Sequence, residues 1–280
     1  MLVYLRELIQ DASGGHYAIP AFNVFGYEDA VAVIRAAEEL DAPVILATNP
    51  GAVQHMPFPY IAPILTRLAE DATVPVVVHL DHGKSYEYVA MAMAYGYTSV
   101  MFDGSQLPLE ENIRVTREIV RLAAMRGIST EAEIGSVGYS DPSIQMKHEY
   151  SDPEEVFRFA EETGVDAVAV SIGTVHRMEV QGAKIDYDLL SRIEAKVAAP
   201  LVLHGSTGVA DEDLRKLAAT RIAKVNIGTA LRMAFGKKLR HEMEIRPDEY
   251  DRIRLFSEPM EAVKQEALHK FRILGLGRDA

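Results

Sequence analysis

Three histidines in this sequence each follow a short apolar run that is rich in β-branched residues. His82 ends VVVHLDH, His176 ends AVAVSIGTVH, and His204 ends PLVLH. If these runs are neighbouring strands of a barrel, their imidazoles converge on one rim, the face where barrel enzymes build their active sites. Three imidazoles around an open coordination position are typical of a catalytic zinc site. The three histidines therefore predict metal chemistry.

Acidic residues stand at the same predicted rim. Asp81 precedes His82, so it can lie beside a metal rather than on it. Glu131 and Glu133 are two residues apart in one predicted strand and therefore share a face. Because buried acids are costly unless a cation or hydrogen-bond donors compensate, this pair indicates either a metal site or a ring of salt bridges inside the barrel. Asp103 ends another strand, where it either faces the rim or caps the following turn.

Two further segments combine glycine with hydroxyl or amide side chains. HGSTG spans 204–208, and NIGT spans 226–229 and leads into a predicted helix whose N-terminus presents free N–H groups. Both follow the last two predicted strands, where barrels often bind phosphate, so we expect a phosphorylated substrate. The residues of these segments expected to contact it are Gly205, Ser206, Thr207, Gly208, Asn226, Gly228 and Thr229.

The composition limits the class of protein. A chain of 280 residues with 48% hydrophobic and 25% charged residues can bury one large core. Its formal net charge of −12 argues against nucleic acid or an anionic membrane as a partner, because either needs a basic surface. With no cysteine, any zinc must be held by nitrogen and oxygen ligands. Arg6, Glu7 and Asp11 argue against a signal peptide, and we expect a cytoplasmic protein.

Short β-branched runs alternate with longer amphipathic segments along the chain. About eight such runs predict parallel βαβ units closed into a (β/α)8 barrel, a single domain over 1–280 whose helices after about residue 229 (229–244 and 258–273) form a C-terminal extension. The alternative, a doubly wound open sheet, would normally carry a GxGxxG turn, and the chain has none. The predicted strands are 18–24, 43–48, 75–80, 98–103, 128–134, 166–172, 200–205 and 223–228, and the predicted helices between them are 27–41, 58–71, 85–95, 108–126, 152–163, 187–197 and 211–219.

The longest stretch without clear periodicity is 135–151, directly after the fifth predicted strand. It is rich in glycine, serine, aspartate and proline. A loop of this length inside a compact barrel is usually functional, and we expect a lid.

Several motifs resemble the class II, zinc-dependent ketose-bisphosphate aldolases, the fructose- and tagatose-bisphosphate aldolase family. The resemblance runs nearly end to end and is most specific in HLDHG (79–83) and GYTSVMFDGSQLPLEENI (96–113), with EAEIGSVG (131–138), IGTVH (172–176) and KVNIGT (224–229) in support. It implies cleavage of a ketose 1-phosphate or 1,6-bisphosphate to dihydroxyacetone phosphate and an aldehyde through an enediolate. It also implies a homodimer or homotetramer.

The resemblance implies roles for individual residues. The catalytic zinc would be held by His82, His176 and His204, with Glu133 joining it in some states and Asp103 nearby. Asp81 would be the acid/base at the C4 hydroxyl, Asp141 the lid acid that protonates the enediolate, and Asn226 a hydrogen-bond donor to that intermediate. The C1 phosphate would be held by Gly205, Thr207, Gly208 and Thr229, near a monovalent cation, Na⁺ or K⁺.

Four positions depart from the family pattern. Arg177 stands where a glycine usually follows the second zinc histidine, and Ser206 adds a side chain within HGSTG where the family has HGGSG. Asn49 stands where the family tends to have a serine for the distal phosphate, and Asp141 is one methylene shorter than the usual glutamate. These departures leave the reaction class intact but weaken the case for fructose 1,6-bisphosphate itself as the substrate.

Three alternative functions compete with this prediction. A metal-dependent phosphosugar isomerase or epimerase would share the enediolate chemistry, and a non-catalytic phosphosugar-binding protein would share the scaffold. A Schiff-base aldolase needs a lysine that projects into the barrel. The strand 166–172 has no lysine, and Lys224 lies early in its strand rather than at the end.

Overall fold

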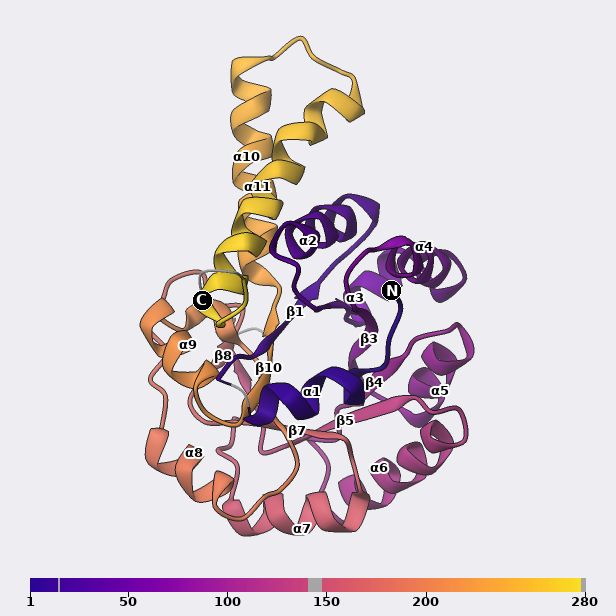
Figure 1. Cartoon of the computed structure of the whole chain (residues 1–280), viewed down its shortest axis with the longest axis vertical. Helices are drawn as coiled ribbons and strands as arrows, with labels where there is room; N and C mark the ends of the chain where they lie inside the picture. The colour runs from indigo at the N-terminus through magenta and orange to yellow at the C-terminus, as the bar shows by residue number, and fades with distance from the viewer. Residues whose placement is uncertain (15, 141–147, 278–280) are drawn as a thin grey trace.

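The structure, a computed structural model, describes residues 1–14, 16–140 and 148–277, and its centre is a closed barrel of eight parallel strands. The order around the barrel is β1-β10-β9-β7-β5-β4-β3-β2, and β1 pairs with β10 to close it, with Ala21 opposite Asn226 (Figure 1). All eight predicted strands are confirmed. They are β1 (Ile19–Asn23), β2 (Val44–Thr48), β3 (Val76–Gly83), β4 (Ser99–Phe102), β5 (Ser129–Ile134), β7 (Ala167–Val170), β9 (Leu201–Leu203) and β10 (Ile222–Ile227).

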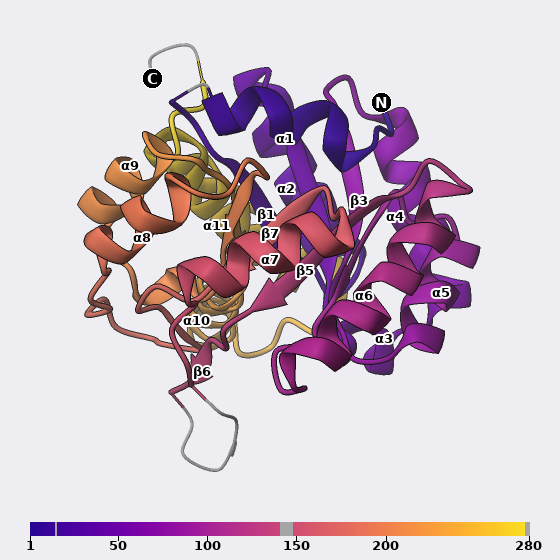
Figure 2. The ribbon, with the colours of Figure 1, turned by 90° about the horizontal axis from the view of Figure 1, so that it is seen from below.

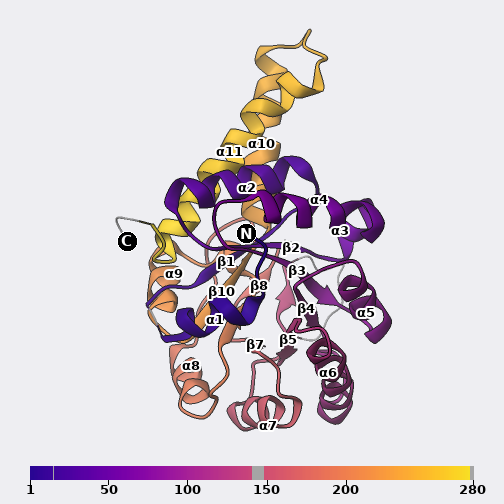
Figure 3. The same cartoon turned by 45° about the vertical axis from the view of Figure 1, so that its right-hand side comes forward.

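Helices surround the barrel in the order that the sequence predicts (Figure 3). The start of α7 illustrates the local cause: the Asp152 carboxylate accepts hydrogen bonds from the backbone N–H groups of Glu154 and Glu155, and Pro153 takes the first helical position, where its missing N–H is not needed. These helices are α2 (Tyr27–Leu40), α4 (Phe58–Asp71), α5 (Tyr86–Ala94), α6 (Leu109–Ala124), α7 (Pro153–Thr163), α8 (Tyr187–Glu194) and α9 (Asp211–Ala218).

Five short elements are not predicted. Helix α1 (Leu5–Gly14) lies across the amino-terminal end of the barrel, opposite the end that carries β6, as Figure 2 shows. Strands β6 (Gly138–Tyr139) and β8 (Val175–His176) pair in parallel as a two-stranded sheet of their own. The other two are α3 (Pro50–His55) and the 3₁₀ turn η1 (Ser206–Gly208).

The chain after the barrel forms a hairpin of two long helices, α10 (Thr229–Ile245) and α11 (Arg252–Ile273), as predicted. Helix α11 begins six residues earlier than the predicted 258, because Asp251 caps it by accepting from the N–H groups of Ile253 and Arg254. The later part of α11 packs on the barrel, where the rings of Phe22 and Phe271 lie 5.5 Å apart. The hairpin tip projects away from the barrel (Figure 1). Among the described residues, no helix is both long and apolar enough to cross a membrane.

The barrel interior has two halves of opposite character. The amino-terminal half is apolar, and α1 closes it by burying Leu5, Ile9 and Ala12 against it. The carboxyl-terminal half contains ionisable and amide side chains that are almost entirely buried. The apolar members contributed by the strands include Ile19, Ala21, Ile45, Val77, Ala167, Val202 and Ala223, and the polar members are His79, Asp81, Glu131, Glu133, Lys224 and Asn226.

Candidate active site

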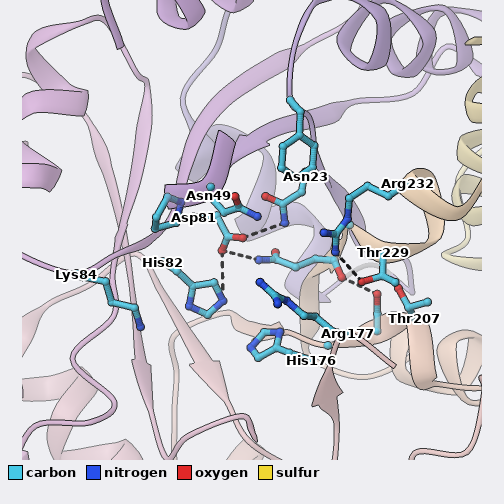
Figure 4. A pocket seen from close by; sticks show the side chains of 17 residues that line it. Asn23, Asn49, Asp81, His82, Lys84, His176, Arg177, Thr207, Thr229 and Arg232 are labelled. Atoms are coloured by element: carbon cyan, nitrogen blue, oxygen red, sulfur yellow. Dashed lines mark hydrogen bonds and ion pairs between the residues drawn. The ribbon is translucent and has the colours of Figure 1, made fainter. Parts of the chain in front are cut away.

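A pocket of about 370 Å³ opens at the carboxyl ends of the barrel strands (Figure 4). Most of the residues expected to contact metal or substrate line it, although they come from every part of the chain. Arg232, Lys84 and Asn23 line it as well and were not predicted. The full lining is Asn23, Phe25, Asn49, Pro50, Gly51, Asp81, His82, Lys84, His176, Arg177, Gly205, Ser206, Thr207, Asn226, Gly228, Thr229 and Arg232.

His82, His176 and His204 form a three-histidine cluster. Their ring centroids are 4.8–6.0 Å apart, and one ring nitrogen of each lies within 4.8 Å of the others. The runs before His176 and His204 are neighbouring strands, β7 and β9, as expected, but the run before His82 is not their neighbour, because β4, β5 and β7 separate β3 from β9. The rings therefore meet across the barrel opening. His176 is not on a barrel strand at all but on β8, beyond the end of β7.

Local backbone features bring these rings together. The pairing of β3 with β4 shifts register between Leu80 and Gly83, and His82 adopts a positive φ of 52°, so that Asp81 and His82 both face the pocket although they are adjacent in sequence. Gly205 has a φ of 70°, and a Cβ there would lie 2.9 Å from the backbone of Val175. Only glycine allows this approach, which brings the segment carrying His176 against the strand that precedes His204.

Two cluster rings are oriented by buried carboxylates. His82 Nδ1 lies 2.7 Å from Asp103 Oδ2, and His204 Nε2 lies 3.0 Å from Glu131 Oε1. With those nitrogens donating, His82 Nε2 and His204 Nδ1 are left facing each other at 3.1 Å. Two nitrogen ligands of a tetrahedral zinc are separated by roughly 3.3 Å, given Zn–N distances of about 2.0–2.1 Å. The two nitrogens therefore fit a shared metal ion.

Glu133 offers an additional ligand to the cluster. Its Oε1 accepts from the backbone N–H of Val137, while its buried Oε2 has no hydrogen-bond partner and lies 3.9 Å from His82 Nδ1 and 4.0 Å from His204 Nδ1. Burial and the nearby Asp103 carboxylate raise the pKa of Glu133. A buried carboxylate oxygen without a donor suits a cation, which is a second observation that the residues fit a metal.

Asp103 both orients His82 and caps a turn. Its Oδ2 faces Nδ1 of the His82 ring, and its Oδ1 accepts from the backbone N–H and the hydroxyl of Ser105. Lys84 forms an ion pair with the same carboxylate. Asp103 also belongs to a second group that could hold an ion, made with His82 and Glu133.

The charges of the cluster follow from its surroundings. Although burial lowers the pKa of His82, the carboxylates of Asp81 and Asp103 outweigh it and raise that pKa to about 9. Burial lowers the pKa of His176, and the neighbouring imidazoles of His82 and His204 lower it further. Because an imidazole binds a metal only in its neutral form, metal binding to the cluster would displace one of the two ring protons of the His82 imidazolium.

Asp81 is held as a carboxylate by amide donors. Asn226 Nδ2 donates to its Oδ1 at 3.0 Å and Asn23 Nδ2 to its Oδ2 at 2.9 Å (Figure 4). Burial alone would raise the pKa of Asp81, but His82, His204 and Lys224 hold it below its usual range. An ionised carboxylate in the pocket can accept a proton. The signal that could have found Asn23 is a polar residue that ends an apolar strand.

One end of the pocket carries side-chain cations and a helix N-terminus. Arg177 and Arg232 both line the pocket, with the Arg232 guanidinium beside Thr229 (Figure 4), and burial together with the charge of Arg177 lowers the pKa of Arg232. Arg232 also donates to the Thr229 hydroxyl at 3.0 Å. Gly228 precedes the first turn of α10 and provides no side-chain cap, so the N–H groups of that turn are available to an anion. Arg232 lies three residues after Thr229 on the predicted helix, which is the spacing that would have identified it.

Thr207, Gly205, Gly228 and Thr229 line this end as expected, whereas two residues of HGSTG differ. The Ser206 hydroxyl donates to the backbone carbonyl of Asn226 at 2.5 Å, and the Ser206 carbonyl accepts from the backbone N–H of Val209. Gly208 does not line the pocket, because it packs under the side chain of Met178 and its carbonyl accepts from Gly182 and Ala183.

Two more predicted residues complete the account. Asn49 lines the pocket, and its Oδ1 caps α3 by accepting from Ala52, so its amide N–H₂ remains as a donor. Asp141 lies outside the described residues.

Comparison with known proteins gives one consistent family. A family model described as class II fructose-bisphosphate aldolase matches residues 3–277. The chain is 36% identical over 283 residues to a probable fructose-bisphosphate aldolase of Bacillus subtilis, covering 100% of this chain and 99% of the relative. It is also 36% identical over 276 residues to the 6-phospho-5-dehydro-2-deoxy-D-gluconate aldolase of Bacillus licheniformis, covering 98% and 94%. The crystal structure of the YdjI aldolase from Escherichia coli K12 superimposes with a TM-score of 0.86 at 36% identity, covering 100% of both chains.

Proposed function

The chain belongs to the class II fructose-bisphosphate aldolase family, a family of metal-dependent carbon–carbon lyases, and we propose that it cleaves a ketose 1-phosphate or 1,6-bisphosphate to dihydroxyacetone phosphate and an aldehyde. One observation carries this proposal: three imidazoles converge beside an ionised Asp81 in a pocket that Arg177 and Arg232 line. Relatives at the same identity carry names for different substrates, so the aldehyde is left open.

Zinc is the metal we propose. His82, His176 and His204 would hold it, with Glu133 as the adjacent carboxylate, and nitrogen and oxygen ligands are the ones this cysteine-free chain can offer. When bound, zinc acts as a Lewis acid for the negative charge that develops on the substrate C2 oxygen.

The side chains around Asp81 suit the proton transfers of a retro-aldol reaction. Breaking the C3–C4 bond leaves its electron pair on C3, delocalised towards the C2 oxygen as an enediolate, while the C4 hydroxyl proton goes to Asp81 and the aldehyde forms. Asn226 Nδ2 uses one hydrogen for Asp81, and its second is available to the enediolate. By resemblance Asp141 returns a proton to C3, which yields dihydroxyacetone phosphate.

The cationic end of the pocket suits the C1 phosphate. Thr207, Thr229 and the first-turn N–H groups of α10 can donate to phosphate oxygens, and Arg177 and Arg232 supply positive charge. By resemblance, Na⁺ or K⁺ also belongs near this phosphate.

A panel of aldol condensations tests the proposal. Zinc-loaded protein is incubated with dihydroxyacetone phosphate and many aldehydes, phosphorylated and not, and new ketose phosphates are measured. We expect condensation that a chelator abolishes and zinc restores. Interconversion of ketose phosphates without a triose phosphate product would favour the isomerase or epimerase alternative. Stoichiometric zinc without turnover on any substrate would favour the binding-protein alternative.

A further inference from the structure

Lys224 is a fully buried lysine in the barrel that the proposed reaction does not use. It lies on β10, two residues before Asn226, and it does not line the pocket. Its Nζ lies 2.8 Å from Glu131 Oε2 and 2.6 Å from Asn226 Oδ1. A buried ammonium is costly compared with an apolar side chain of similar size, so its two partners are the features to explain.

The first partner, Glu131, connects Lys224 to the metal cluster. Glu131 Oε1 lies 3.0 Å from His204 Nε2, and the ammonium beside Oε2 keeps the group a carboxylate, which can only accept. His204 must then carry its proton on Nε2. Its Nδ1 is left with a lone pair that faces His82 Nε2 at 3.1 Å, where the metal would bind. A carboxylate that fixes the tautomer of a metal-binding histidine in this way raises metal affinity.

The second partner, Asn226, connects Lys224 to the proposed acid/base. An ammonium can only donate, so the amide oxygen of Asn226 must face Lys224 and its Nδ2 must face Asp81 Oδ1, at 3.0 Å. Nδ2 also comes within 3.3 Å of His204 Nε2, but both nitrogens carry hydrogen, so this contact is not a hydrogen bond. If the Asn226 amide were rotated by 180°, its oxygen would face the Asp81 carboxylate, and two acceptors would repel each other.

We propose that Lys224 is a positioning residue for both halves of the site. Through Glu131 it fixes which nitrogen His204 presents to the metal, and through Asn226 it fixes the amide orientation that serves Asp81. The second half rests on the proposed aldolase function, whereas the first concerns metal binding alone.

Three variants separate positioning from a structural role. Lys224→Met removes both contacts. The double variant Lys224→Met/Glu131→Gln also removes the Glu131 charge that Lys224→Met leaves buried and unpaired, so the variant should still fold. The amide oxygen of the glutamine can still accept from His204 Nε2–H. Ser99→Ala is the matched control, because Ser99 is also fully buried and bonds His79 at 2.8 Å, and among the described residues it makes no hydrogen bond to Glu131, His204 or Asn226.

Zinc affinity, measured by competition with a chromophoric chelator, is the first readout. We expect Lys224→Met to weaken it by about 10- to 100-fold, the double variant to recover it to within a few-fold of the parent, and Ser99→Ala to leave it unchanged. In the metal-free parent, ¹⁵N NMR should find the His204 proton on Nε2, and in Lys224→Met a mixture of tautomers. Parental zinc affinity in folded Lys224→Met, or an equal loss in Ser99→Ala, would overturn the proposal.

Turnover is the second readout and concerns only the Asn226 contact. The double variant at saturating zinc should still lose about tenfold or more in kcat, since the amide is no longer held. Parental kcat in that variant would refute this half. If the parent shows no aldolase activity, the proposed function fails. The zinc affinities and the His204 tautomer would still test whether Lys224 positions His204 through Glu131.

Discussion

The two halves of the interior of one barrel are built from opposite classes of residue. On β3, Val77 belongs to the apolar half, while His79 and Asp81, at steps of two residues along the same face, belong to the polar half. Burial of the apolar half stabilises the fold by roughly 25 cal/mol per Å² of apolar surface. Burying the polar half costs free energy unless its groups pair with one another. Stability and chemistry thus occupy separate layers, and substitutions in each layer should have different effects.

The largest expected effect is the loss of a cluster imidazole in the polar half. His204→Ala should reduce aldolase activity by more than about 10³-fold, because even the loss of one donor to a developing oxyanion costs about 10²–10³. Bound zinc per chain, measured by mass spectrometry of the dialysed protein, should fall with it. A folded variant that retains zinc and turnover would show that the cluster is not the metal site.

Asp81→Asn should have the next largest effect. The amide cannot accept the C4 hydroxyl proton, so kcat should fall by about 10²–10⁴-fold, the usual contribution of a positioned acid/base. Zinc content should stay at the parental level, because the Asp81 carboxylate is nearer to its amide donors than to any cluster nitrogen. Loss of zinc in parallel with kcat would instead assign Asp81 to the metal.

Ile45→Ala tests the apolar half, where we expect a loss of stability without a loss of zinc affinity or activity. Ile45 is fully buried on β2, and removing its side chain should lower the free energy of unfolding by about 2–5 kcal/mol. Zinc affinity and kcat of the folded protein should stay within about twofold of the parent, since no chemistry lies in that layer. Urea unfolding beside a zinc titration measures both. If Ile45→Ala changed zinc affinity strongly and left stability unchanged, the two halves would not have separate roles in stability and chemistry.

The smallest expected effect lies outside the barrel, at Asp211. Burial would raise the pKa of Asp211, but Lys270 and His269 on α11 outweigh it and lower that pKa. A lowered folded pKa stabilises the fold above the unfolded pKa of about 3.9 and loses that effect as the pH falls below it. Because Asp211 is partly exposed, Asp211→Asn should lower the free energy of unfolding by about 1 kcal/mol or less at pH 7. Thermal unfolding should show the difference disappearing between about pH 4 and pH 2, and a difference that persists there would contradict the assignment.

The sequence predicts the fold well because each barrel element carries its own local signal. The β-branched runs and the capped amphipathic segments correspond to the eight strands and to the helices between them. Helix α1 was missed although Leu5, Ile9 and Ala12 follow helical spacing, which is the signal that finds it. Strands β6 and β8, at two residues each, are too short to produce a period.

The candidate site is only partly predictable, because its geometry depends on contacts between distant residues. Histidines at strand ends indicate a rim, and the order of the eight strands places β3 and β9, the third and the seventh, opposite each other, but it does not give the distances between the rings. The pairing of Lys224 with Glu131 joins residues far apart in the chain and follows from the closure of the barrel, not from any local pattern. Glu131 forms the expected salt bridge, with Lys224, and also contacts the His204 imidazole, while Glu133 faces the imidazoles of both His82 and His204.

His176 differs from the other two cluster histidines in the part of the structure that holds it in place. His82 and His204 are anchored by the barrel ladder, whereas His176 is held on β8 by a short pairing with β6, in the segment that follows β5. The position of one of the three candidate metal ligands thus rests on a pairing outside the barrel. A metal held by all three imidazoles would therefore depend on the β6–β8 pairing as well as on the barrel, and a change that breaks this pairing should weaken metal binding while the barrel stays folded.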